Sequence, residues 1–239
     1  MSKFRLDTEL VRRGLVETRS QAENYIKLGY VEVDGKIIKK SGYFINNYQK
    51  IKLSKKQQYV GRGGLKLEAA NNNFKLNFKN KVVLDVGSST GGFTDYAHQH
   101  GAKKIIAVDV GTGQMHPKLC RSSAVELHEK TDIRDFIPKI RPDIILADLS
   151  FISLRQVLPH LAQIAGLKTQ LIILFKPQFE TKPSQINRGI IKNDRIRREI
   201  IKNFENRIKN LFKTVDKMDS QVTGEHGNIE RFYHLQKIK

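Results

Sequence analysis

The chain has 239 residues, of which 39% are hydrophobic, so it is long enough for one large domain or for a small domain and a medium one. Lys and Arg number 43 against 24 Asp and Glu, and this excess indicates a polyanionic partner, with nucleic acid ahead of a membrane. The single cysteine, Cys120, excludes an internal disulfide and a multi-cysteine zinc site. No secretory signal is visible, and no apolar run approaches the roughly 20 residues of a membrane span, so we expect a cytoplasmic protein without stable membrane association.

Residues 1–58 are predicted to form a small basic domain, with 13 Lys and Arg against 6 Asp and Glu. Two helices are predicted, each followed by a glycine that ends it, and after them come three short strands. These elements are expected at residues 7–13, 18–28, 30–33, 37–40 and 49–53.

Five stretches of this first domain have a specific order and spacing. They are FRLD at 4–7, LVRRGL at 10–15, Ser20 with Ala22, IKLG at 26–29 and VEVDG at 31–35. Together they resemble the S4 RNA-binding domain, a small α+β fold. Arginine suits phosphate because its planar guanidinium donates two parallel hydrogen bonds. The expected RNA contacts are Arg5, Arg12, Arg13, Arg19 and Lys27.

Residues 59–64 contain three glycines and predict a flexible hinge, after which strands and helices alternate from residue 65 to residue 239. Apolar, β-rich runs typical of buried parallel strands lie at 82–86, 105–109, 143–148 and 171–176, with a weaker one at 124–127. Helices are predicted over 154–165 and 194–212, and a final edge hairpin over 214–218 and 231–236. The pattern predicts a Rossmann-like, doubly wound α/β domain.

A glycine-rich loop follows the first strand of this domain and predicts a cofactor site. Its spacing matches neither the dinucleotide fingerprint nor a P-loop, so a ligand without phosphate, such as S-adenosylmethionine, fits better. We expect Asp85 to bind the cationic methionine part, Asp109 the ribose hydroxyls and Asp132 the adenine amino group. The expected loop contacts are Gly87, Ser88, Thr90, Gly91, Gly92 and Phe93.

Four charged residues lie at predicted strand ends or at a helix start, namely Lys66, Asp148, Lys176 and Glu230. In an open α/β sheet, chemistry takes place in the crevice outside the carboxyl ends of the strands. A lysine that ends an apolar strand is costly to bury unless it is paired. Each residue alone is also compatible with a structural ion pair, so the active-site hypothesis rests on all four residues together.

The strings around these four residues are distinctive. They are GRGGLKL at 61–67, DLSFISL at 148–154, KPQFE at 176–180 and GNIE at 227–230. They resemble the TlyA family, S4-linked members of the FtsJ-like 2′-O-methyltransferases that are often labelled hemolysins. The resemblance implies ribose 2′-O-methylation of a cytidine in large-subunit ribosomal RNA, and in some members also in small-subunit RNA. It further implies that the four charged residues form a Lys-Asp-Lys-Glu active site.

Methyl transfer from a sulfonium is an in-line displacement, so positioning supplies much of the rate. Lys176 is the candidate to take or to polarise the proton of the ribose hydroxyl. A lysine acts as a base only when it is neutral. Burial and the cation of Lys66 favour the neutral form, whereas Asp148 and Glu230 oppose it, so an electrostatic role for Lys176 stays open. The seven histidines show no metal-ligand spacing, and the mechanism requires no metal.

Three other functions were weighed. A catalytically silent RNA-binding protein is disfavoured because the four charged positions are all intact. A membrane-active hemolysin would need a secretion signal and a long apolar or amphipathic insertion segment, and neither is visible. A methyltransferase of proteins or small molecules is disfavoured by the S4-like domain. Ribosomal RNA or ribosomal subunits are therefore the expected partners, while the target nucleotide and the oligomeric state stay open.

Overall fold

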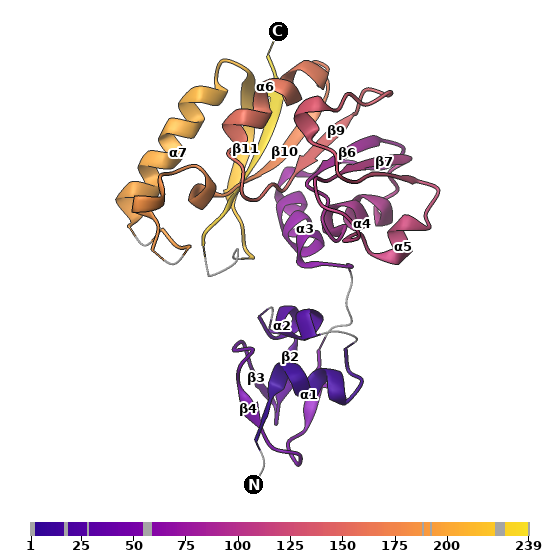
Figure 1. Cartoon of the computed structure of the whole chain (residues 1–239), viewed down its shortest axis with the longest axis vertical. Helices are drawn as coiled ribbons and strands as arrows, with labels where there is room; N and C mark the ends of the chain where they lie inside the picture. Colours follow the sequence, from indigo (N-terminus) through magenta and orange to yellow (C-terminus); the bar gives the residue numbers. More distant parts are fainter. Residues whose placement is uncertain are drawn as a thin grey trace. The chain divides into compact units, whose positions relative to one another are not determined.

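The computed structural model describes residues 3–16, 19–27, 29–54, 59–187, 189–191, 193–222 and 228–238, apart from the side chains of residues 20, 21, 24, 27 and 183. The chain divides into two compact units, Met1–Gln58 and Tyr59–Lys239 (Figure 1). Each unit has its own hydrophobic core, because the buried apolar clusters of one share no residue with those of the other.

The smaller unit packs two helices against two short antiparallel sheets. Its elements are β1 (Phe4–Arg5), α1 (Leu6–Arg12), α2 (Arg19–Lys27), β2 (Val31–Val33), β3 (Lys36–Ile37), β4 (Phe44–Ile45) and β5 (Ile51–Leu53). Strand β2 lies between β3 and β5, and β1 pairs with β4. Apolar residues of both helices, such as Leu10 and Ile26, pack on Val31 and Ile45 from the sheets. This small core holds α1 and α2 in fixed positions.

The larger unit is built on a seven-stranded sheet in the order β11-β12-β10-β9-β6-β7-β8. The strands are β6 (Val82–Val86), β7 (Lys104–Val108), β8 (Val125–His128), β9 (Ile144–Ala147), β10 (Gln170–Phe175), β11 (Phe212–Asp219) and β12 (Arg231–Lys237). Strand β12 is antiparallel to both of its neighbours, and the other pairings are parallel. The chain runs outward from β6 to β8 and returns to β9 on the other side of β6, so the topological switch point lies between β6 and β9.

Helices cover both faces of this sheet (Figure 1). They are α3 (Arg62–Phe74), α4 (Gly92–Gln99), α5 (Pro117–Cys120), α6 (Leu154–Ile164) and α7 (Asp194–Ile208), with short 3-10 turns at Ile133–Asp135, Pro177–Phe179 and Pro183–Gln185. Helices α6 and α7 pack on one face, against residues such as Val86, and α3 and α4 pack on the other, against residues such as Val83. Alternate residues of a strand therefore face opposite layers, which explains the continuous apolar runs of the sequence.

Residues 59–64, predicted as a flexible hinge, pack into the larger unit. Tyr59 is 2% exposed, and the backbone amide of Val60 donates to the buried carboxylate of Asp95 at 2.8 Å. Helix α3 begins within the segment. A Cβ atom on Gly64 would lie 2.4 Å from the Tyr59 side chain, so here glycine provides space for packing rather than freedom.

The end of one helix and two short strands differ from the prediction. Helix α7 ends at Ile208, and Phe212 is instead the buried first residue of β11. Strands β1 and β4 were not predicted, since two residues carry no alternation that a pattern could reveal. The ends of the second predicted helix, Thr18 and Leu28, lie outside the described residues. The remaining predicted strands of the larger unit are present, including the weakest one, which is β8.

Candidate active site

The four charged candidates form two short ion pairs in the larger unit. Lys66, in the second turn of α3, donates to Glu230, directly before β12, with 2.6 Å between Nζ and Oε2. Both of these side chains are buried. Lys176, directly after β10, lies 2.7 Å from the carboxylate of Asp148, directly after β9. Because β9 and β10 are parallel neighbours, their carboxyl ends bring these two residues together.

The two ion pairs belong to one electrostatic site. Burial alone would raise the pKa of Asp148, but the positive charges of Lys176, Lys66 and Arg62 lower it. The Asp148 carboxylate is therefore ionised at neutral pH and holds Lys176 in place. The Lys176 ammonium also donates to the hydroxyl of Ser150 at 2.8 Å, a contact that the sequence did not predict.

The glycine-rich loop lies between β6 and α4, next to the end of β9. Gly87 has a φ of +78°, and a Cβ atom there would lie 2.8 Å from the backbone oxygen of Asp148. Gly91 has a φ of +93°, and its Cβ would overlap the Leu119 side chain. Only glycine fits both positions without strain. Ser88 is buried and Thr90 is exposed on the same loop, and the Ser88 hydroxyl has no hydrogen bond to the part of the chain that the structure describes.

Asp85, near the end of β6, and Asp109, directly after β7, flank this loop in different environments. Asp85 is fully buried, and the hydroxyl of Thr94 donates to its Oδ2 at 2.6 Å, while its Oδ1 has no hydrogen-bond partner among the described residues. Burial raises the pKa of Asp85 to about 7. Asp109 is half-buried after β7, and its two oxygens accept the backbone amides of Ser89 and Gly111, both at 2.7 Å.

Three of the residues predicted to bind the cofactor already have packing or hydrogen-bond partners within the protein. Phe93 is 3% exposed in the core and stacks on Phe232, so its side chain is removed from the proposed cofactor contacts. Gly92 faces α3, because its Cβ would lie 2.9 Å from the backbone of Gly63. Asp132 accepts from the backbone amide and the guanidinium of Arg134, and the latter bond lowers the pKa of its carboxyl group.

Two residues next to the ion pairs were missed by sequence reasoning. Glu180 is buried and accepts from the Leu154 amide and the Ser153 hydroxyl, both at 2.6 Å, so it fixes the start of α6. Phe151 is 90% exposed with a φ of +64°, and its ring centre lies 5.2 Å from that of Phe179. The acidic Glu180 close to the end of the strand that carries Lys176 was a usable signal, whereas a phenylalanine between Leu149 and Ile152 looks like a core residue.

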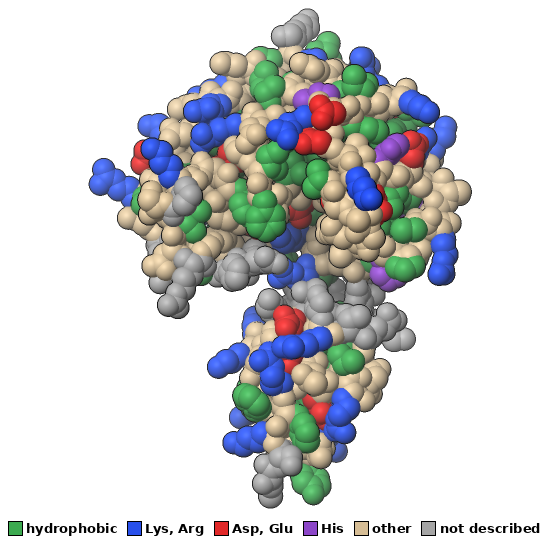
Figure 2. Space-filling model, in the orientation of Figure 1, with side chains coloured by type: hydrophobic (Ala, Val, Ile, Leu, Met, Phe, Trp, Pro, Cys, Tyr) green, Lys and Arg blue, Asp and Glu red, His purple; other side chains and the backbone are tan. Residues whose placement is uncertain are grey.

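Four arginines of the smaller unit are arranged around two buried carboxylates. Asp7 pairs with Arg5 and Arg19, and Glu9 pairs with Arg12 and Arg13. Hydrogen bonds from Arg5 and from Arg12 lower the pKa of Asp7 and of Glu9, respectively, although burial opposes them. Figure 2 shows Lys and Arg side chains over much of the visible face of this unit. The side chain of Lys27 lies outside the described residues.

Comparison with known proteins identifies the family. The model of the FtsJ-like methyltransferases matches residues 59–237, and the model of the S4 domain matches residues 4–46. A Mycobacterium tuberculosis protein named 16S/23S rRNA (cytidine-2′-O)-methyltransferase TlyA is 34% identical over 98% of this chain and 90% of its own length. The chain belongs to the TlyA family of S4-linked, FtsJ-like methyltransferases.

Other relatives of this TlyA-family chain carry two kinds of name. The Bacillus subtilis protein named putative rRNA methyltransferase YqxC is 38% identical over 98% of this chain and 85% of its own length. A solved structure titled putative hemolysin, from Streptococcus thermophilus, superposes with a TM-score of 0.77 at 38% identity, covering 100% of this chain and 90% of that one. Within the described ranges, no helix is both long enough and apolar enough to cross a membrane.

Proposed function

We propose that the chain transfers a methyl group from S-adenosylmethionine to the 2′-hydroxyl of a cytidine in large-subunit ribosomal RNA. The observation that carries this proposal is the Lys176–Asp148 pair at the carboxyl ends of β10 and β9, next to the glycine-rich loop at the switch point. The names of relatives that modify cytidine ribose in ribosomal RNA support the choice of substrate. Modification of small-subunit RNA as well is an outcome that the test distinguishes.

The residues around the loop fit S-adenosylmethionine. The orphaned Oδ1 of Asp85 is a buried acceptor, and the ammonium of the methionine part would satisfy it. Gly87 has no side chain, so the loop backbone packs directly against the backbone oxygen of Asp148 and lies beside the proposed active site. The carboxylate of Asp109 retains lone pairs for two vicinal hydroxyls, and Asp132 is proposed near the adenine amino group. When bound, the cofactor supplies a methyl group on a positively charged sulfur.

The four charged residues of the chain would then position and deprotonate the ribose. Lys176 contacts the 2′-hydroxyl and takes its proton as the new oxygen–carbon bond forms, which requires a neutral amine. Asp148, at 2.7 Å, fixes the direction of Lys176. Burial raises the pKa of Asp148, but the charges of Lys176 and Lys66 lower it, so the carboxylate stays ionised to hold Lys176.

The smaller unit is proposed to bind the RNA, through Arg5, Arg12, Arg13, Arg19 and Lys27. The buried carboxylates of Asp7 and Glu9 hold the first four of these side chains, which reduces the entropy lost on binding phosphate. Because ribosomal subunits are the proposed partners, the proposed location is the cytoplasm.

The test is single-turnover methylation of ribosomal subunits, combined with mapping of 2′-O-methylation in cells with and without the gene. Lys176→Ala should reduce the rate by about 10²–10⁴-fold, the usual effect of removing one positioned proton acceptor. Lys176→Arg should not restore the rate, since a guanidinium stays protonated. Lys168→Ala, which removes an exposed lysine of the same unit, is the matched control.

Each result has a definite meaning. Near wild-type turnover by the Arg variant would leave Lys176 a role in charge stabilisation only. Near wild-type turnover by the Ala variant would remove the active-site assignment. RNA binding without any cofactor-dependent methylation would favour the catalytically silent alternative, and lysis of membranes by the purified protein would favour the hemolysin.

A further inference from the structure

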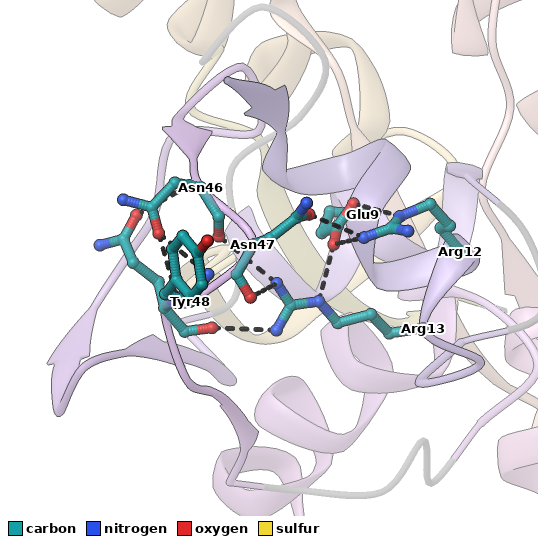
Figure 3. Close-up of polar contacts among 7 residues, drawn as sticks. Glu9, Arg12, Arg13, Asn46, Asn47 and Tyr48 are labelled. Atoms are coloured by element: carbon teal, nitrogen blue, oxygen red, sulfur yellow. Dashed lines mark hydrogen bonds and ion pairs between the residues drawn. The ribbon is translucent and has the colours of Figure 1, made fainter. Parts of the chain in front are cut away.

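An exposed aromatic residue, Tyr48, lies on the turn Asn46–Gln49 of the smaller unit (Figure 3). Its side chain is 86% exposed. Within the described part of the chain, its ring has no aromatic or cationic partner and its hydroxyl has no hydrogen bond. A tyrosine that packs buries on the order of 150–250 Å², so this ring contributes little to the fold and is available to a partner.

The turn that carries Tyr48 is nevertheless well ordered. The side-chain oxygen of Asn46 accepts the backbone amides of Tyr48 and Gln49, both at 3.1 Å. The Gln49 side chain accepts the Asn46 amide at 3.1 Å and donates to Asp34 at 2.8 Å. The backbone of Tyr48 is therefore fixed before any partner arrives, and a partner pays little of the entropy of ordering it.

Arg12, the last residue of α1, and Arg13, directly after it, both donate hydrogen bonds to this turn (Figure 3). Arg13 donates to the backbone oxygens of Gln49 at 2.9 Å and of Asn47 at 3.3 Å. Arg12 donates through Nη2 to the Asn47 side chain at 3.0 Å and to the carboxylate of Glu9. The Arg12 side chain is still 56% exposed, so an accessible cation stands beside the aromatic turn.

We propose that Tyr48 and Arg12 bind one unpaired nucleotide of the RNA, with the base stacked on the tyrosine ring and the phosphate at the guanidinium. This rests on the proposed function and adds that the substrate offers a single-stranded base to the smaller unit. The side chains that form hydrogen bonds to the turn are polar, whereas the core of a protein–protein interface is apolar, so this surface suits RNA better than a protein partner. Exposed aromatic rings beside arginines are the groups that bind single-stranded RNA.

The test compares the affinity of the full chain for two RNAs of equal charge, a hairpin with an unpaired loop and a duplex of the same length. Tyr48→Leu should weaken binding of the hairpin roughly 5- to 150-fold, the value of one stacked base, and should change duplex binding little. Tyr48→Phe keeps the ring and should bind the hairpin as the wild type does. Ile37→Ala, which removes another exposed apolar side chain of this unit, is the matched control.

Several results would contradict the proposal that a base stacks on Tyr48. Unchanged hairpin affinity in Tyr48→Leu, or an equal loss on the duplex, excludes base stacking. A loss that appears only with intact ribosomal subunits, and not with protein-free RNA, shows docking on a ribosomal protein instead. Single-turnover methylation of ribosomal subunits by the wild type tests the proposed function separately, so failure of the function and failure of this site are distinguishable. Thermal unfolding of each variant confirms that the fold is intact.

Discussion

At the scale of single residues, the carboxyl group of Asp85 makes folding depend on pH. Burial raises its pKa to about 7, and the hydrogen bond from Thr94 only partly opposes the rise. Between the unfolded pKa of about 4 and the folded value, the folded state binds more protons than the unfolded state. The stability of the cofactor-free protein therefore falls as pH rises through this window. Above pH 7 the full destabilisation from the ionised, buried Asp85 carboxylate is present.

Asp85→Asn should remove this cost, because the amide is never charged and its oxygen can still accept from Thr94. In the cofactor-free protein we expect a gain of up to roughly 4 kcal/mol in unfolding free energy at pH 8, and a smaller gain at pH 5. Urea unfolding at the two pH values measures it, with the exposed Asp135→Asn as the control. Equal gains at both pH values would contradict the assigned pKa. Cofactor affinity should fall in the same variant.

The charged pairs of the candidate site could be anticipated from the sequence, but the positions of its aromatic residues could not. Lys176 follows an apolar strand, where a charge requires a partner, and the structure supplies Asp148. Phe93 follows the loop glycines yet points into the core, and Phe151 has the apolar neighbours Leu149 and Ile152 yet is exposed. The direction of a loop side chain depends on backbone angles such as the positive φ of Phe151, which no pattern of residue types encodes.

At the scale of elements, the start of α3 packs closely on the start of α4. A Cβ on Gly92 would lie 2.9 Å from the Cα of Gly63 and 3.0 Å from two backbone nitrogens of α3. Backbone atoms cannot rotate away as a flexible side chain can, so the helices would have to separate. Lys66 lies one turn beyond this contact on α3, so a shift of α3 would change the distance between Lys66 and Glu230.

Gly92→Ala should therefore destabilise the protein by about 1–3 kcal/mol, a usual cost of overpacking. It should also reduce the rate of methyl transfer more than RNA affinity, because α3 carries Lys66 but none of the arginines of the smaller unit. Urea unfolding and single-turnover methylation measure the two effects. Gly166→Ala is the control, since its nearest neighbour is the flexible side chain of Arg141 at 3.0 Å. Wild-type stability of the Gly92 variant would show that the helices can separate at no cost.

Long elements were predictable because their burial pattern repeats, and short ones were not. Strands β6, β7, β9 and β10 are buried on both faces and therefore appear as continuous apolar runs. The end of α7 was placed too late because Leu211 and Phe212 continue the helical period after the backbone has left it. The glycines of residues 59–64 suggested flexibility. The sequence could not reveal their packing, because it comes from α4, including Asp95, which is distant in sequence.

At the scale of the whole molecule, both units are basic, so net charge alone does not say which one binds RNA. The smaller unit has 13 Lys and Arg against 6 Asp and Glu, and the larger has 30 against 18. The smaller unit differs in arrangement, because its arginines are fixed on Asp7 and Glu9. If fixed arginines determine affinity, the smaller unit should dominate binding, and if net charge does, the larger unit should.

Removal of residues 1–58 tests this distinction. The remaining chain keeps its three hydrophobic clusters and all proposed cofactor residues, so calorimetry should show unchanged S-adenosylmethionine affinity, which also verifies its fold. RNA affinity should fall, and each lost phosphate contact should flatten the dependence of log K on log salt by about 0.7–0.9. The loss of several contacts predicts a change of more than two in this slope. A truncated chain that keeps both the affinity and the slope of the full chain would assign RNA binding to the larger unit, since its own basic surface would then be sufficient.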